Sequence, residues 1–257
     1  MTERSEGISQ SWFCGTSDPD ASVQLFCFPY AGGNAAAFLP WQPLLGRDVE
    51  LWVAQLPGRG GRLFETPPHD LDDLVAQLTE AVAEHVDRPF ALFGHSLGAL
   101  VAFEVARALR RDGLPTPDSL WVAGAEGPQT RAVVHPLHDL PDAELVEALR
   151  DYGGTPTELL DDREMMELLL PGLRADLALD ECYTYRPGAP LDLPIHLLLG
   201  NRDPHVEPTR VAGWSYESSQ PVRRHVFPGD HFFLFPHQAT ITALLATALA
   251  ADPTTTR

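Results

Sequence analysis

The stretch FALFGHSLGALVAFEVARAL, residues 90–109, places five small and polar residues between a short apolar run and a helical pattern. The run over 89–94 predicts a buried strand, and the apolar spacing over 99–113 predicts a helix. Between them, GHSLG matches G-x-S-x-G, in which a serine occupies a sharp strand-to-helix turn and the flanking glycines leave room for the backbone. A glycine-rich turn with a chemically idle serine would also match, so Ser96 needs partners elsewhere in the chain.

Strand-like and helix-like segments alternate along the whole chain, which is typical of a mostly parallel sheet flanked by helices. We therefore expect an α/β fold with a mostly parallel central sheet in one domain, residues 1–257. Strands are predicted within 22–33, 49–62, 89–94, 119–127, 193–200 and 222–229, and helices over 70–86, 99–113 and 237–252.

The connection between the strands at 119–127 and 193–200 is far longer than the two to six residues plus one helix that are usual. Its helical patterns are interrupted at 153–154 and 171–172. We expect this insertion, approximately 128–190, to form a helical lid over the carboxyl ends of the strands; an extra packing layer is the alternative. Met165, Met166 and the leucines at 168–170 form an apolar cluster that favours a lid, and we expect both methionines to contact substrate.

A serine hydroxyl becomes a good nucleophile only when a base takes its proton. In hydrolases that carry the serine in a G-x-S-x-G turn, the acid and the base follow the serine in the order Ser, Asp, His. Asp203 follows the strand at 193–200 and His231 follows the last strand, so both would reach the carboxyl edge of the sheet. Asp203 could instead cap the turn before Pro204, His231 could be an ordinary surface-loop histidine, and Asp230 is a weaker candidate for the acid.

Two backbone N–H groups are expected to hold the oxyanion. One belongs to Leu97, at the N-terminus of the helix that follows the serine. The other is expected from the loop FPYAGGN after an earlier strand, where a glycine pair lets the backbone approach closely. Ala31 is our candidate and Tyr30 its nearest rival, and we also expect Tyr30 to contact substrate. A glycine turn that merely reverses the chain is the alternative.

The composition excludes several function classes. With 36 acidic and 18 basic residues the net charge is −18, which disfavours nucleic acid and anionic membranes as partners. No apolar run approaches the roughly 20 residues that a membrane helix needs, and MTERSEGISQ does not resemble a signal peptide. The three cysteines and the pair in HPLH, residues 135–138, lack the spacing of a metal site. We expect a cytoplasmic protein with free thiols, no metal and no organic cofactor.

The blocks LFCFPYAGGNAAAF, QLPGRGGR, FALFGHSLGALVAFEVAR, LLLPGLRADLALDECYTY, LLLGNRDPHV and FPGDHFFL together resemble the type II (external, stand-alone) thioesterases of polyketide synthase and non-ribosomal peptide synthetase pathways. The resemblance runs from about Val23 to Leu249. It implies an α/β-hydrolase fold with a helical lid and a catalytic triad of Ser96, Asp203 and His231. It also implies a proofreading role, in which aberrant or stalled acyl groups are hydrolysed from the phosphopantetheine arm of acyl or peptidyl carrier proteins.

Other interpretations stay open beside this resemblance. A small-molecule carboxylesterase or lipase could use the same triad, and a protein of the same fold could bind acyl chains without catalysis. We expect a monomer. Because carrier domains are usually acidic, like this chain, docking needs a local basic face or apolar contact. Candidate basic contacts are Arg59, Arg62, Arg110 and Arg111.

Overall fold

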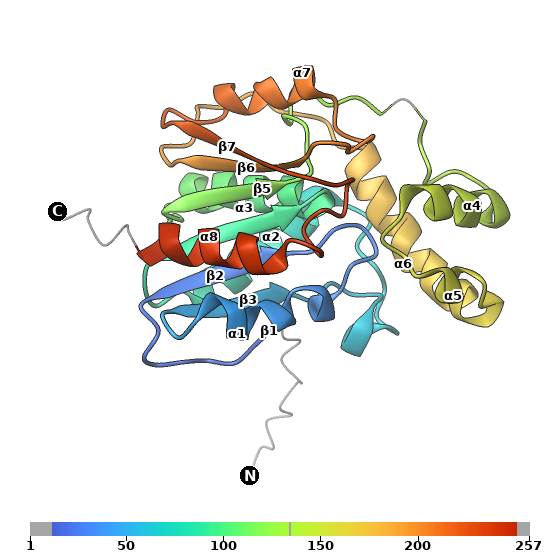
Figure 1. Cartoon of the computed structure of the whole chain (residues 1–257), viewed down its shortest axis with the longest axis horizontal. Coiled ribbons are helices and arrows are strands. Elements are labelled where there is room, and N and C mark those ends of the chain that lie inside the picture. Colours follow the sequence, from blue (N-terminus) through green and yellow to red (C-terminus); the bar gives the residue numbers. More distant parts are fainter. Residues whose placement is uncertain (1–11, 134, 251–257) are drawn as a thin grey trace, which may run out of the picture.

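The sheet confirms the predicted α/β fold. The computed structural model describes residues 12–133 and 135–250, and within them seven strands form one sheet in the order β1-β3-β2-β4-β5-β6-β7 (Figure 1). All neighbouring strands are parallel except β1 and β3, which are antiparallel. The strands are β1 Phe13–Gly15, β2 Val23–Phe28, β3 Val49–Ala54, β4 Phe90–His95, β5 Ser119–Ala123, β6 Ile195–Gly200 and β7 Val222–Phe227.

Helices cover both faces of the sheet, and each face holds its own apolar core (Figure 1). Helices α2 (Leu71–His85) and α3 (Leu97–Arg111) pack on one face, and α1 (Gln42–Leu45) and α8 (Gln238–Ala250) pack on the other. The side chain of Asp70 caps α2 by accepting the N–H of Asp73, as expected of an aspartate before an apolar periodic segment. The four-residue helices α1 and α7 (Pro208–Val211) and strand β1 are too short to produce a periodic pattern.

The insertion between β5 and β6 contains three helices, α4 (Asp142–Tyr152), α5 (Thr157–Leu160) and α6 (Arg163–Glu181), at one end of the sheet (Figure 1). The predicted interruption at 171–172 was wrong, because α6 continues through Pro171. Buried apolar residues on both sides of the proline hold the helix against the domain, which outweighs the lost hydrogen bond. At Gly172 a Cβ would lie 2.9 Å from the Gly58 carbonyl oxygen, so only glycine permits this close crossing.

Three further properties concern membrane-spanning helices, metal binding and cysteines. In the described part of the chain no helix has the length and apolarity to cross a membrane. Among the same residues no group of three or more histidine, cysteine, aspartate or glutamate side chains could hold a metal ion. The cysteines Cys14, Cys27 and Cys182 are all free thiols.

His196 makes the stability of the fold depend on pH. Its ring stacks on Trp121 at 3.8 Å and lies parallel to the ring of His225, whose Nε2 is 3.2 Å from Nδ1 of His196. Burial, and then the neighbouring His225, lowers the pKa of His196 to about 4 from the usual 6.5. The folded state therefore favours the neutral ring, and its stabilisation is complete above about pH 6.5 and is lost as the pH falls towards 4.

We expect His196→Phe, which keeps the ring stack but cannot bind a proton, to weaken this dependence. The fall in Tm between pH 7.5 and pH 5 should be smaller in the variant than in the wild type, as measured by thermal unfolding at a series of pH values. An identical fall in both proteins would show that other groups cause the acid sensitivity.

Candidate active site

Ser96 occupies a strained turn between β4 and α3. Its backbone has φ 56° and ψ −119°, and among the described residues it is the one non-glycine with positive φ. The turn is tight: a Cβ would lie 2.0 Å from the Gly98 carbonyl oxygen if placed on Gly94, and 1.9 Å from the Phe28 carbonyl oxygen if placed on Gly98. The two glycines of the GHSLG pattern are therefore sterically required, and the strained backbone raises the serine at the end of the strand.

The structure brings Asp203 and His231 together at the same edge of the sheet. Asp203 follows β6 and His231 follows β7, and both side chains are almost fully buried. Nδ1 of His231 donates to Oδ2 of Asp203 at 2.8 Å. Asp230 is not the partner of the histidine, since its carboxylate accepts the backbone N–H of Phe232. Such a carboxylate contact holds the imidazole in one tautomer, with Nε2 left as the basic atom.

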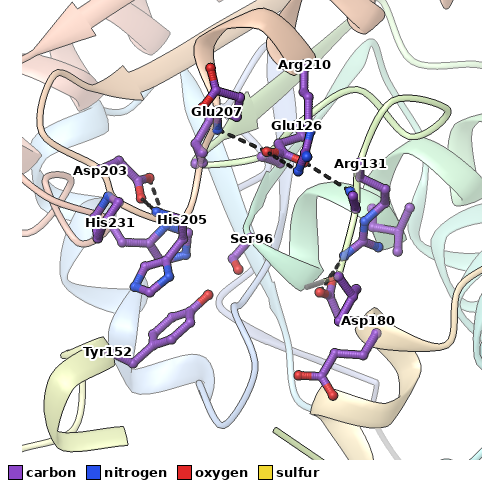
Figure 2. A pocket seen from close by; sticks show the side chains of 18 of the residues that line it. Ser96, Glu126, Arg131, Tyr152, Asp180, Asp203, His205, Glu207, Arg210 and His231 are labelled. Atoms are coloured by element: carbon purple, nitrogen blue, oxygen red, sulfur yellow. Dashed lines mark hydrogen bonds and ion pairs between the residues drawn. The ribbon is translucent and has the colours of Figure 1, made fainter. Parts of the chain in front are cut away.

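The Nε2 atom of His231 is buried and has no hydrogen-bond partner within the described residues. The serine instead lies within hydrogen-bonding reach of the Tyr152 hydroxyl group. Tyr152 ends helix α4, its ring stacks on His205 at 3.8 Å, and it meets His231 edge-on at 5.3 Å (Figure 2). Burial, together with the negative charge of Asp180, raises the pKa of Tyr152, so its hydroxyl group stays protonated near neutral pH.

Sequence reasoning missed Tyr152 and His95 and assigned no role to His205. Nε2 of His95 lies 2.9 Å from the backbone carbonyl oxygen of His231 and so supports the loop that carries the base. Burial lowers the pKa of His95 well below its usual value, which keeps the ring neutral for this bond. The only sequence signals were a histidine at the variable position of the serine motif and a tyrosine before a glycine pair.

The predicted oxyanion donors lie on neighbouring segments. Because Gly98 allows α3 to touch the backbone of Phe28, the loop after β2 begins beside the N-terminus of α3. The N–H groups of Ala31 and Leu97 have no acceptor within the described part of the chain. On the same loop, Gly32 donates to Asp176 and Gly33 donates to the Tyr30 carbonyl oxygen. Ala31 and Tyr30 therefore each keep an N–H group that could be offered to an oxyanion.

Two cavities meet at Ser96, and Tyr152 and His231 line both. The larger has a volume of about 870 Å³ and is lined by charged groups, including the ion pair between Arg131 and Asp180 at 2.5 Å (Figure 2). The smaller, about 40 Å³, is mainly apolar and is lined by Tyr30, Ala31, Leu149, Leu173, Leu177 and Phe232 among others. The serine thus stands between a wide cavity that contains charged side chains and a narrow, mainly apolar one.

The other residues predicted to contact substrate or a partner lie in different parts of the structure. Tyr30 lines the apolar cavity as expected, but Met165 is 40% exposed on the outer side of α6. Met166 is buried among the helices of the insertion and lines a different cavity of about 310 Å³, which Ser96 does not reach. The helical period explains the difference, because it turns Leu173 and Leu177 towards the serine. Arg59 and Arg62 are buried in ion pairs, so neither forms a surface patch.

Comparison with known proteins decides the family. Residues 23–249 match the thioesterase domain family. The chain belongs to this family. This thioesterase is 38% identical to the gramicidin S biosynthesis protein GrsT of Aneurinibacillus migulanus, over 89% of the chain and 90% of GrsT. It is also 36% identical to the thioesterase PikA5 of Streptomyces venezuelae, over 84% of the chain and 77% of PikA5.

Solved structures agree with this assignment. The type II thioesterase BorB from the borrelidin biosynthetic cluster superimposes with a TM-score of 0.85 and 36% identity, over 95% of this chain and 99% of BorB. RedJ, a thioesterase of the prodiginine pathway of Streptomyces coelicolor, gives 0.84 and 39%, over 91% and 88%. The chain is a type II thioesterase with the α/β-hydrolase fold, a hydrolase of the kind found in polyketide and non-ribosomal peptide biosynthesis.

Proposed function

We propose that this thioesterase removes aberrant or stalled acyl groups from the phosphopantetheine arm of acyl or peptidyl carrier proteins. Ser96 is the nucleophile, His231 the general base and Asp203 the residue that orients the base. The observation that carries this proposal is the buried contact between His231 and Asp203 at the sheet edge where the strained turn presents Ser96.

The proposed reaction has two halves. The serine hydroxyl attacks the thioester carbonyl carbon while its proton moves to Nε2 of His231. The N–H groups of Leu97 and Ala31 hold the negative oxygen of the tetrahedral intermediate. This intermediate collapses with loss of the pantetheine thiolate, which takes the proton from His231. In the second half His231 removes a proton from water and the resulting hydroxide attacks the acyl carbon of the acyl-enzyme. The bond between this carbon and the serine oxygen then breaks, His231 returns the proton to the serine oxygen, and the free acid leaves.

The two cavities suggest how such a substrate would lie. The wide cavity, with its charged side chains, suits the amide-rich pantetheine arm, and the narrow apolar cavity suits the acyl group. The apolar cavity has only about 40 Å³, so short acyl groups fit without rearrangement. We propose that the insertion acts as a lid, since Tyr152 from its helices lines both cavities and Leu177 lines the smaller one. All these residues come from one chain, which supports action as a monomer, and we place that action in the cytoplasm.

The competing function is a small-molecule esterase that uses the same three residues. The two are distinguished by incubating the wild type with carrier proteins loaded with acyl chains of increasing length and, separately, with p-nitrophenyl esters of the same acids. We expect kcat/KM to be higher for the acyl-carrier proteins, measured as release of the free carrier thiol, than for the p-nitrophenyl esters. Among the carrier substrates, short acyl chains should be released fastest. Unchanged acyl-carrier levels beside fast ester cleavage would favour the esterase.

The Tyr152 hydroxyl group lies within reach of Ser96, and we propose that it competes with His231 for the serine hydroxyl. Tyr152→Phe keeps the ring stack on His205 but removes the hydroxyl group. Because one hydrogen bond contributes about 0.5–1.5 kcal/mol, Ser96 should be labelled by a fluorophosphonate about 2–10-fold faster in the variant. A labelling rate reduced more than threefold would instead mean that the hydroxyl group assists the nucleophile.

A further inference from the structure

A buried ion pair joins the proposed oxyanion loop to helix α6. Nη2 of Arg59 donates to Oδ1 of Asp176 at 2.5 Å, and Nη1 contacts Oδ2 of the same carboxylate. Asp176 has no exposed surface, and Arg59 is 5% exposed. Arg59 lies in the loop after β3, and Asp176 lies in the second half of α6, so the two residues are 117 positions apart in the sequence.

Both members of the pair also hold the backbone that follows Ala31. The N–H of Gly32 donates to Oδ2 of Asp176 at 2.7 Å, and Nη1 of Arg59 donates to the Gly33 carbonyl oxygen at 3.2 Å. Gly32 has φ +76°, and a Cβ there would lie 2.7 Å from Leu173 of α6. The ion pair therefore holds the loop through two hydrogen bonds. Because Gly32 has no side chain, the loop can lie directly against α6.

Stability alone does not account for this arrangement. Removing two charges from water costs about as much as a buried pair returns, and apolar replacements of such pairs are often neutral or stabilising. Here the pair is also incompletely satisfied, because the buried Nε of Arg59 has no partner in the described part of the chain. Two apolar side chains would pack α6 against the loop, but they would offer no acceptor to the Gly32 N–H and no donor to the Gly33 carbonyl.

We propose that Arg59 and Asp176 are positioning residues of the oxyanion hole. They fix the peptide units on the C-terminal side of Ala31, and thereby the direction of the Ala31 N–H towards the tetrahedral oxygen. This inference rests on the proposed function, because it takes Ala31 as a donor to the oxyanion.

The same contact makes α6 a fixed wall of the site. Leu173 lies three residues before Asp176 and Leu177 directly after it, and both line the apolar cavity. The carboxylate that holds the oxyanion loop therefore also fixes the position of this wall. An acyl group that displaced α6 would strain the Asp176 contact and turn the oxyanion donor. The geometry of the acyl cavity and that of the oxyanion hole are therefore coupled through one side chain.

The double variant Arg59→Met/Asp176→Leu tests the proposal because it removes both charges together. We expect its Tm to remain within a few degrees of the wild type, KM for a short acyl-pantetheine thioester to change less than threefold, and kcat to fall about 30–100-fold, since a small displacement of a catalytic group has effects of this size. A trifluoromethyl ketone analogue, which forms a tetrahedral adduct with the serine, should lose affinity by a similar factor.

Arg62→Met provides the matched control. Arg62 is a buried arginine of the same loop that binds Glu65 and the Gln55 carbonyl oxygen and makes no contact with the glycine pair. We expect it to lower Tm with kcat within twofold of the wild type. If the double variant does not fold, Asp176→Asn is used, which keeps one acceptor for either Gly32 or Arg59; its kcat should fall about tenfold.

A folded double variant, or failing that a folded Asp176→Asn variant, with kcat and analogue affinity within twofold of the wild type would overturn the proposal. Equal losses of kcat in Arg62→Met and the double variant would also overturn it, because the effect would then come from loosening the loop. Failure of the proposed function has a different signature, since the wild type itself would then not hydrolyse the thioester or would keep its activity without the hydroxyl group of Ser96.

Discussion

Ser96→Ala is expected to lower kcat for thioester hydrolysis by at least about 10⁴-fold, because removing the nucleophile of a serine hydrolase leaves only binding and oxyanion stabilisation. The fold should be unchanged, since alanine keeps the Cβ that the turn already accommodates. The measurement is steady-state hydrolysis of an acyl-pantetheine thioester, together with mass spectrometry for an acyl adduct on the protein. Wild type should show the adduct under rapid quench, and the variant should not.

Ser96→Gly provides an independent control on the turn. At φ 56° and ψ −119° a residue with a Cβ is strained by about 1–3 kcal/mol, and glycine is not. The glycine variant should therefore be as inactive as the alanine variant yet have a higher Tm, by about 2–4 °C per kcal/mol recovered. Hydrolysis near the wild-type rate in either variant would exclude Ser96 as the nucleophile, and equal Tm values would show that the turn is unstrained.

The strong periodic patterns were sufficient to predict the sheet and its main helices. Most of the described parallel strands come from apolar runs that lead into a glycine- or proline-containing turn, and a parallel sheet gathers the ends of such runs at one edge. This is why Asp203 and His231 could be placed together although they are 28 residues apart. The short β1 and the continuity of α6 through Pro171 could not be predicted, because packing rather than local pattern decides both.

The residues that surround the serine were harder to predict. Tyr152 reaches Ser96 only because the whole of α4 folds back over the sheet edge, and no local feature of the sequence encodes that contact. Arg59 looked like a surface residue in a glycine-rich loop, since nothing nearby could neutralise it. Its partner is Asp176, on the other side of the site. Met165 was assigned to the substrate for its apolarity, whereas helical phase turns it to solvent.

Asp203→Asn should be the second most damaging single substitution of the site, with kcat lowered by about 10²–10⁴-fold. The carboxylate now accepts the Nδ1 hydrogen of His231, so Nε2 is the basic atom. An asparagine amide group in the same place can donate to Nδ1, which favours the tautomer with the proton on Nε2 and removes the base. The shape of the site is preserved, because the asparagine oxygen still accepts the backbone N–H of His205.

Asp230→Asn is the matched control, since Asp230 is the neighbour of His231 in the sequence and also caps a turn through a backbone N–H. The two variants change charge and shape identically, yet only one of them touches the imidazole. We expect Asp230→Asn to keep kcat within about twofold and both variants to keep the Tm of the wild type within a few degrees. Comparable losses in both would mean that the charge near the loop matters rather than the tautomer of His231. A large loss in Asp230→Asn alone would transfer the orienting role to Asp230, despite the contact that the structure gives to Asp203.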